Sequence, residues 1–438
     1  MPPSPISPLQ SLPSPDDITR VPLPNGITVL ARANFNSPSV VFTGYLHAGS
    51  LYEPDEKLGL AGFAAAALMH GTARHTHQEL FDILETAGAS LGFDGGTHTM
   101  SFSGRALSED LDLLLALAAD CLRHPTFPPE EVERLRAQLL TGLALRDQDP
   151  DAVASLTFDK LIYPHHPYSR PDEGEPATIQ SITPADLAAF HARTVGPRGM
   201  GLAIVGSVDP ARAVEKAARV FGDWANPDQP EPATLPALSP LTESKRQHVF
   251  IPGKSQTSLV MGVAGPARND PGFLAASLGN NILGQFSMGG RIGEVVREQK
   301  GLAYYAYSGL SGGTGPGPWS ISAGVAPEDV DEAIALIREE IARFTTEGVT
   351  EEELADSKAN YIGRLPLSME SNAGVAGALI NIERHGLELD YYRTYADRLN
   401  AITRGEVVEA ARRYLDVNRM GVASAGPETP VQMTGTSK

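Results

Sequence analysis

The chain has 438 residues, and its 53 acidic and 35 basic side chains give a formal net charge of −18. This balance argues against a general phosphate-backbone binder and against electrostatic docking to anionic membranes, because no broad cationic surface is supplied. Hydrophobic residues make up 42% of the chain, as is typical of a soluble protein with sizeable buried cores. At roughly 150 residues per domain, this length predicts two or three domains.

The single cysteine, Cys121, excludes a disulfide framework and any cysteine-based zinc knuckle. The longest nearly apolar stretch, residues 58–69, is too short to span a bilayer. Residues 1–17 are rich in Pro and Ser and lack the basic and apolar regions of a signal peptide, so they predict a disordered lead-in. We therefore expect a cytoplasmic protein without a membrane segment.

In chain order, residues 21–30 predict a hairpin, with Asn25-Gly26 as a two-residue type I′ turn between apolar runs. Strands are expected over residues 39–47 and 97–104, and helices over residues 59–68, 77–87, 108–121 and 128–145. Strands and helices thus occur in separate runs, which indicates an α+β fold.

An internal repeat divides the chain into two halves. Residues 182–206 and 402–426 align without gaps at an offset of 220, and each copy is expected to form a helix followed by a strand. The copies share seven identities, at Ile182, Thr183, Arg193, Met200, Gly201, Ala203 and Gly206. Between the halves, residues 226–240 contain five prolines and predict a stiff linker. The sequence therefore predicts two homologous α+β domains of roughly 200 residues each.

The usual signatures of a hydrolase are absent from the sequence. None of the 11 histidines belongs to a His-Glu-x-x-His or His-x-x-Glu-His motif. The close pairs His75/His77 and His165/His166 lack one-turn spacing, so we interpret them as surface or capping residues. Cys121 ends an apolar helix and is interpreted as a core residue. No nucleophile elbow or P-loop is present, and the glycine-rich residues 312–317 are expected to form a hairpin loop.

One segment, residues 284–309, combines a glycine-rich loop, a short helix ending near Lys300-Gly301 and a strand from Leu302. By pattern alone, this segment is an ordinary connection between a helix and a strand. However, Arg297-Glu-Gln-Lys-Gly-Leu-Ala-Tyr304 resembles the second-domain signature of the M16 metallopeptidase family, in which such an Arg and Tyr hold the substrate. Residues 23–30 resemble that family's first hairpin, and residues 47–54 with 59–72 resemble the segment leading into its active site.

This resemblance implies two tandem homologous domains, each a mostly antiparallel sheet packed with helices, of the M16 peptidase-like or LuxS-metallohydrolase-like type. The expected boundaries are a lead-in at 1–17, a first domain at 18–225, a linker at 226–243, a second domain at 244–430 and a tail at 431–438. The family's two zinc-binding histidines and its catalytic glutamate fall on Gly62, Ala66 and Ala65. Its third ligand falls near Thr141 and Gly142. Because glycine and alanine carry no donor atom, we expect no metal in this chain.

Three functions remain open after this comparison. The chain is a non-catalytic M16 subunit whose partner carries His-x-x-Glu-His and zinc, a scaffold without proteolysis, or a hydrolase with another nucleophile. We favour the first function, in which Arg297 and Tyr304 bind unfolded peptide. We expect no nucleic-acid partner. The resemblance implies substrate addition at a sheet edge, for which the strand after Tyr304 is the candidate. Residues 284–293 form either a mobile flap or a simple turn.

Overall fold

The computed structural model describes residues 12–428, which form two compact units. Among them, unit 1 comprises residues 12–143, 171–234 and 363–396, and unit 2 comprises residues 144–170, 235–362 and 397–428. One boundary falls between Thr234 and Leu235, inside the proline-rich segment. Two other boundaries lie inside the helices Pro129–Arg146 and Glu351–Ser368, one inside the short helix Tyr395–Ala401 and one in a loop between residues 170 and 171. Each unit therefore includes segments from both halves of the sequence. The expected tail at 431–438 lies outside the described residues.

Unit 1 contains a six-stranded sheet in the order β1-β2-β6-β3-β5-β4. Its strands are β1 (Thr19–Pro22), β2 (Thr28–Ala33), β3 (Ser39–Leu46), β4 (Ser90–Gly95), β5 (Met100–Leu107) and β6 (Gly201–Gly206). The β2–β6 pair is parallel, and the remaining pairs are antiparallel. β6 is buried along its whole length, as expected for a central strand covered on both faces.

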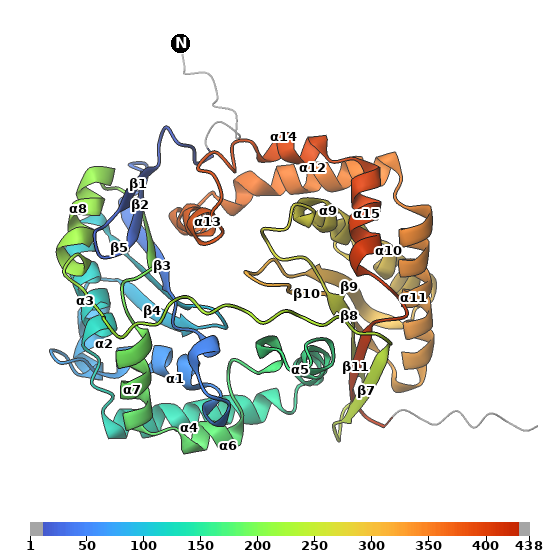
Figure 1. Ribbon diagram of the computed structural model, residues 1–438, viewed down its shortest axis with the longest axis horizontal. Helices are drawn as coiled ribbons and strands as arrows, with labels where there is room; N and C mark the ends of the chain where they lie inside the picture. The colour runs from blue at the N-terminus through green and yellow to red at the C-terminus, as the bar shows by residue number, and fades with distance from the viewer. Residues whose placement is uncertain (1–11, 429–438) are drawn as a thin grey trace, which may run out of the picture. The chain divides into compact units, whose positions relative to one another are not determined.

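Helices cover both faces of the unit 1 sheet (Figure 1). The α-helices of unit 1 are α1 (Leu60–Ala67), α2 (His77–Thr86), α3 (Leu111–Arg123), most of α4 (Pro129–Arg146), α6 (Pro176–Ser181), α7 (Pro184–Thr194), α8 (Pro210–Phe221) and α13 (Asn372–Arg384). One face, with Phe42 and Phe102, packs against α1, α3 and α8 in a large apolar core. The opposite face packs against α13.

Unit 2 contains a five-stranded sheet in the order β7-β11-β8-β10-β9. Its strands are β7 (Lys245–Phe250), β8 (Thr257–Ala264), β9 (Ala303–Leu310), β10 (Pro318–Val325) and β11 (Gly421–Gly426). The β7–β11 pair is parallel and the others are antiparallel. Omitting β1, the two sheets have the same strand order and pairing directions, and the second domain repeats the first.

The helices of unit 2 are α5 (Pro150–Ile162), α9 (Phe273–Gly284), α10 (Gly290–Gly293), α11 (Val330–Glu347), most of α12 (Glu351–Ser368), α14 (Tyr395–Ala401) and α15 (Arg404–Tyr414). A six-residue π-helical segment, η7 (Glu294–Gln299), continues from α10. Figure 1 shows α5 on one side of this sheet and α9, α10, α11 and α15 on the other. The fold is therefore α+β, as predicted.

The repeat detected in the sequence is confirmed residue by residue. α7 and α15 begin at residues 184 and 404, and β6 and β11 begin at residues 201 and 421. Thr183 and Thr403 each accept a hydrogen bond from the backbone amide of the third helical residue, whose acidic side chain in turn accepts one from the threonine amide. Gly206 and Gly426 end their strands at φ values of 152° and 155°. The shared identities therefore mark helix starts and strand ends.

Two helices are exchanged between the sequence halves. α5 follows α4 in the first half, yet Ala154, Phe158 and Ile162 pack against the unit 2 sheet. Conversely, α13 belongs to the second half, and its apolar side packs on β3 and β6 of unit 1. Arg20 binds Glu383 of α13 in an ion pair of 2.7 Å. Each sheet is thus completed by a helix from the other half of the chain.

Three local expectations differ from the structure. Five residues separate β1 from β2, and Asn25 does not have the positive φ that a type I′ turn requires, because its side chain instead donates to Phe221 and Trp224 carbonyls. The strand expected at 97–104 begins at Met100. The lead-in lies partly outside the described residues, but Leu12 is buried and Asp16 binds Arg393, so disorder is wrong for residues 12–17.

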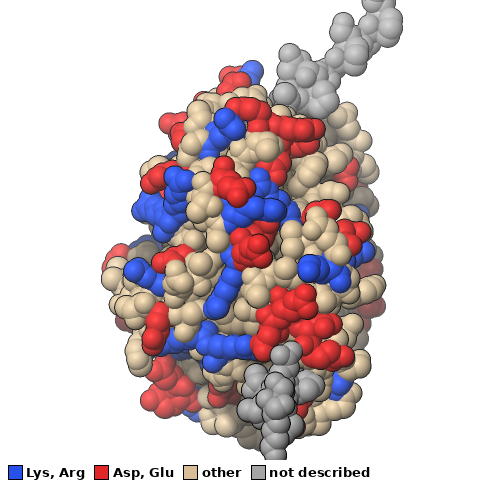
Figure 2. Space-filling model, turned by 90° about the vertical axis from the view of Figure 1, so that its right-hand side faces the viewer, with Lys and Arg blue, Asp and Glu red and all other residues tan. Residues whose placement is uncertain are grey.

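Charges on the unit 2 surface are mixed. Figure 2 shows a face on which Lys and Arg side chains alternate with Asp and Glu, without a continuous basic area. Pairs such as Arg246–Asp331 and Lys300–Glu332 neutralise many of the cations of this unit. This pattern agrees with the exclusion of a phosphate-backbone binder. Among residues 12–428, no helix has the length and apolar character needed to cross a membrane.

Candidate functional site

The positions on which the zinc motif is expected to fall, Gly62, Ala65 and Ala66, lie on α1, where the helix spacing suits a metal site but the side chains do not. Ala65 is fully buried in the unit 1 core, and Gly62 lies against Gly95 of β4. On α4, Thr141 is exposed and donates its hydroxyl to the Ala137 carbonyl. None of these residues offers a carboxylate or imidazole, so they do not fit a zinc ion.

Arg297 lies in η7, near the unit 2 sheet. Its side chain is about one-third exposed (35%), and within residues 12–428 its guanidinium pairs only with Glu298, at 3.6 Å. The Arg297 carbonyl accepts from the Gly301 amide, and the Leu302 amide donates to the Val296 carbonyl, both at 3.0 Å. Gly301 has a φ of 66°, which allows the chain to turn from η7 directly into β9. Arg297 and Tyr304 are therefore held by one compact turn.

Tyr304 lies on β9 and is 79% exposed. β9 is the last strand of the unit 2 sheet, which confirms the predicted edge strand. Ala303 pairs with Val325 and Tyr305 pairs with Gly324, so Tyr304 is an extra residue in a β-bulge. Bulges redirect a side chain and occur frequently beside binding sites. The tyrosine hydroxyl has no hydrogen-bond partner among residues 12–428. The sequence pattern gave no sign of this bulge.

The glycine-rich segment 284–293 packs tightly against its surroundings. A Cβ at any of its four glycines would lie 2.2–2.4 Å from a backbone atom. These atoms are Ser308 N for Gly284, Ala306 O for Gly289, Ile282 O for Gly290 and Met288 O for Gly293. Two of the four therefore approach β9 itself. Close backbone packing explains these glycines, and the segment contains α10 in place of a simple turn.

β9 is attached to α5 by a hydrogen bond from Tyr305, on the sheet face that α5 covers. The Tyr305 hydroxyl and the Ser258 hydroxyl both donate to Asp151 Oδ1 at the start of α5. Burial, followed by the interaction with Asp151, raises the pKa of Tyr305 well above its usual value, so the hydroxyl stays a donor. The exchanged helix thereby supports the strand that carries Tyr304.

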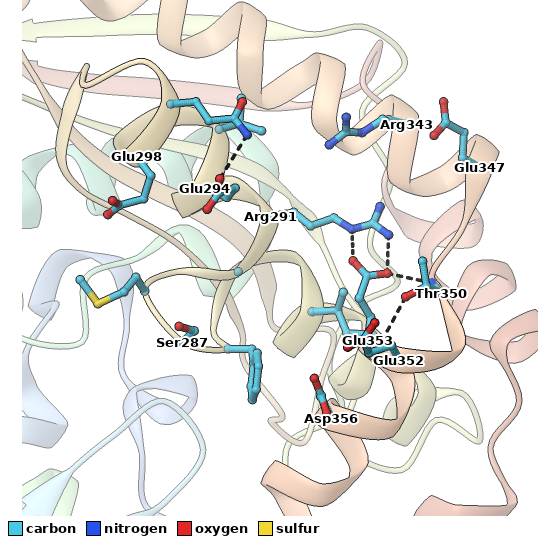
Figure 3. A pocket seen from close by; sticks show the side chains of 16 residues that line it. Ser287, Arg291, Glu294, Glu298, Arg343, Glu347, Thr350, Glu352, Glu353 and Asp356 are labelled. Carbon is cyan, nitrogen blue, oxygen red and sulfur yellow. Dashed lines mark hydrogen bonds and ion pairs between the residues drawn. The ribbon is translucent and has the colours of Figure 1, made fainter.

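A cavity of about 740 Å³ lies beside the helical segment that carries Arg297, between α10, η7, α11 and α12 (Figure 3). Six carboxylates and two arginines line it, and Figure 3 shows Arg291 directed at Glu353. The guanidinium binds both Glu353 oxygens at 2.6 Å. Burial alone would raise the pKa of Glu353, but the hydrogen bonds from Arg291 and the Thr350 amide bring it below its usual value. This pair fixes α10 to α12, and the excess of carboxylates disfavours an anionic ligand.

A cluster of potential metal ligands occurs elsewhere in unit 1. One ligand atom each from His70, His77 and Glu131 lies within 4.8 Å of the others. His70 Nδ1 is 3.1 Å from Glu131 Oε2, and His77 Nδ1 is 2.9 Å from the Met69 carbonyl. The sequence pattern grouped His77 with His75 and gave no sign of this cluster. His70 and His77 end and begin two different helices, so their seven-residue separation is not the two-turn spacing of a single helix face.

The remaining candidate residues have structural roles. His75 and His124 flank the buried carboxylate of Asp120, which also accepts a hydrogen bond from Thr72. His165 is exposed, and His166 is buried and accepts from the Tyr168 amide. Cys121 is fully buried, and burial raises its thiol pKa to about 12, so the predicted core role is confirmed. The hairpin loop expected at residues 312–317 connects β9 to β10, as predicted.

Comparisons with known proteins agree with this architecture. Residues 28–171 match the family model "Insulinase (Peptidase family M16)", and residues 181–361 match "Peptidase M16 inactive domain". An uncharacterized zinc protease of Mycobacterium leprae is 27% identical over 420 residues, covering 94% of this chain and 92% of the relative. A similar protein of Streptomyces coelicolor is 24% identical, with 83% and 79% covered.

Two solved structures have the same fold. A peptidase M16 inactive domain from Pseudomonas fluorescens is 30% identical, covers 94% of this chain and 98% of its own, and has a TM-score of 0.86. A Helicobacter pylori protease is 20% identical, covers 95% and 100%, and also has a TM-score of 0.86. The two family models, the repeated sheets and these relatives together show that the chain belongs to the M16 peptidase family.

Proposed function

We propose that this chain is the non-catalytic, substrate-binding subunit of a heteromeric M16 zinc peptidase that degrades unfolded peptides. Its partner carries His-x-x-Glu-His and the zinc ion. The observation that carries this proposal is the contrast between the two domains. The first lacks donor atoms at Gly62, Ala65 and Ala66, whereas the second presents Arg297 and Tyr304 with side chains that remain available for a ligand.

Arg297 and Tyr304 have donors suited to a peptide backbone. The Tyr304 hydroxyl lacks a partner among the described residues, and the Arg297 guanidinium has only a long contact with Glu298. In the proposed complex, both donate to substrate carbonyl oxygens near the bond to be cleaved. Tyr304 also stabilises the negative charge that develops on the carbonyl oxygen during attack. A fixed donor placed at such an oxyanion contributes about 3–4 kcal/mol, or 10²- to 10³-fold in rate.

Strand addition at β9 provides a sequence-tolerant way to hold the peptide. An edge strand presents backbone donors and acceptors that an extended chain pairs with, whatever its side chains. Tyr304 and Tyr307 are 79% and 49% exposed on this strand, and they offer apolar area beside the backbone groups. This arrangement favours unfolded peptides over folded proteins as substrates.

The test is reconstitution with an M16 chain that carries the zinc motif, preferably one encoded beside this gene. The chain alone is expected to cleave no peptide, and activity should appear with the partner. Arg297→Ala and Tyr304→Phe should each lower the activity of the complex by about 10²-fold or more. The control is Arg246→Ala, at a position on β7 of the same unit where the arginine pairs with Asp331, and it should leave activity nearly unchanged.

Binding of the partner must be measured together with activity, by size-exclusion chromatography of each variant. A complex that assembles normally and loses activity only with Arg297→Ala or Tyr304→Phe supports the proposal. Full activity of both variants in the assembled complex overturns the role of the pair. A complex without peptidase activity favours the scaffold function instead, and peptidase activity of the chain alone contradicts a non-catalytic subunit.

A further inference from the structure

The end of α1 and the starts of α2 and α4 meet at a group of three side chains that the proposed function does not use. His70 ends the 3₁₀ turn that follows α1, His77 is the first residue of α2, and Glu131 lies in the first turn of α4. We propose that His70, His77 and Glu131 bind a divalent transition-metal ion of the zinc class. Two imidazoles and one carboxylate form a ligand set typical of such ions.

The backbone holds the two histidines together. Gly71 and Thr76 form an antiparallel bridge, so the residues that flank this pair, His70 and His77, are neighbours across a closed loop. Within the loop, the Thr72 amide donates to the His75 carbonyl at 2.8 Å. Gly71 has a φ of 140°, which a residue with a side chain rarely adopts. The backbone positions of the two histidines are therefore fixed before any ion binds.

The same loop positions the carboxylate. The Thr126 amide donates to the Gly71 carbonyl at 3.0 Å, and Thr72 forms a bridge with Pro125. These contacts attach the segment that precedes α4 to the loop between the histidines. Glu131 then approaches His70, and its side chain is only 16% exposed, compared with 13% for His70. The cluster is partly shielded from water but accessible to an ion.

The hydrogen bonds made by the two histidines leave each ligand residue a lone pair for a metal ion. His77 Nδ1 donates to the Met69 carbonyl, which fixes the ring and leaves Nε2 as the nitrogen with a free lone pair. Such an outer hydrogen bond is typical of metal-binding histidines. His70 Nδ1 and Glu131 Oε2 share a proton at 3.1 Å. The ion takes the place of that proton, which passes to solvent, and so ion binding weakens as the pH falls.

The His70 ring must turn before both histidines bind one ion, because the His77 ring is held by its hydrogen bond to Met69. In the structure the two imidazoles stack with centroids 4.3 Å apart and planes inclined by 12°, an arrangement in which their lone pairs do not converge. Ligand atoms about 2.0–2.1 Å from a tetrahedral ion lie about 3.3 Å apart. The three atoms lie within 4.8 Å of one another, so closure requires movements of up to about 1.5 Å. Rotation of the His70 ring about its Cβ–Cγ bond and a small shift of Glu131 supply this.

This site differs from the zinc site of the family motif and from our expectation of no metal in this chain. His70 lies four residues beyond Ala66, in the 3₁₀ turn after α1, and Glu131 lies ten residues before Thr141, in the first turn of α4. The ion would connect three helix ends within unit 1. We assign it a stabilising role, because a ligand that binds only the folded state raises the free energy of unfolding.

The test uses the full chain without a histidine tag, treated with a chelator and titrated with ZnCl₂ in a calorimeter. We expect one ion per chain and a rise in the melting temperature with Zn²⁺ concentration. His70→Ala, His77→Ala and Glu131→Gln should each weaken binding by at least about 10-fold, because loss of even an outer-shell partner costs 10- to 100-fold. His165→Asn removes an exposed histidine elsewhere, at a φ of 61° that asparagine tolerates, and should leave binding unchanged.

Circular dichroism of each metal-free variant distinguishes lost binding from lost folding, and Glu131→Gln preserves the size of the side chain. Absence of a tight Zn²⁺ isotherm overturns the proposal, as does equal weakening by His165→Asn. Retention of wild-type affinity in folded His77→Ala also overturns it. Peptide cleavage by the reconstituted complex tests the proposed function separately, since Arg297 and Tyr304 lie in the other unit.

Discussion

Because α5 packs on the unit 2 sheet, we expect a substitution that leaves a cavity in this helix to destabilise unit 2. Phe158 is 2% exposed and packs with Val260, Ala423 and Ala425 of the sheet. A phenylalanine buries about 150–250 Å², which at about 25 cal/mol/Å² corresponds to about 4–6 kcal/mol as an upper value. Measured Phe-to-Ala substitutions in cores cost about 3–5 kcal/mol, so we expect Phe158→Ala to lower the free energy of unfolding by that amount.

Two measurements test this prediction. In a unit of this size, 1 kcal/mol shifts the melting temperature by about 2–4 °C, so the transition of unit 2 should fall by about 6–20 °C. Hydrogen exchange should increase in β8 and β11, which contact α5, and stay unchanged in β3 and β6, which contact α13. The second measurement reports which sheet the helix stabilises.

The matched control is Phe250→Ala, which removes the same side chain from β7 of the same unit at a position that is 55% exposed. Its effect should remain within about 0.5–1 kcal/mol. If Phe158→Ala is no more harmful than Phe250→Ala, or if it increases exchange in β3 and β6 instead, α5 does not complete the second sheet and the exchange of helices is wrong.

Two further predictions concern the region around Arg291 and the glycine-rich segment. Because the folded-state pKa of Glu353 is lowered, its contribution to stability is present above its ordinary pKa and is lost as the pH falls through the folded value. Thermal melts of wild type and Glu353→Gln should therefore differ at pH 7 and converge between about pH 5 and pH 3, and a constant difference would contradict this. Gly289→Ala should destabilise by about 1 kcal/mol or more, because its φ is 110° and the new Cβ would meet Ala306 O at 2.3 Å. Gly363→Ala, in an open position on α12, should stabilise by up to about 1 kcal/mol, and equal effects of the two substitutions would refute the packing argument.

Local features of the sequence were sufficient to predict much of the fold. Helix starts are marked by residues that cap them, as at Thr183 and Thr403, and the structure places both helices at these residues. The offset of 220 residues predicted the repeat, because identities at helix starts and strand ends record equivalent backbone positions. The type I′ turn at Asn25 failed for a tertiary reason, since that side chain satisfies two carbonyls near the end of α8.

The candidate site was only partly accessible from the sequence. The spacing of Arg297 and Tyr304 and the lack of donor atoms at Gly62, Ala65 and Ala66 are evident from the sequence alone. The bulge at Tyr304 depends on how β9 aligns with β10, and no local pattern encodes that register. The meeting of His70, His77 and Glu131 likewise depends on bridges between distant backbone segments.

The sequence by itself determined most element types, the repeat and the absence of donor atoms at Gly62, Ala65 and Ala66, because these follow from neighbouring residues and from side-chain identity. Only the tertiary structure decided which helix covers which sheet. β6 and β8 are apolar on both faces, which requires two covering layers but does not specify their source. The exchange of α5 and α13 meets that requirement through packing between segments far apart in the chain.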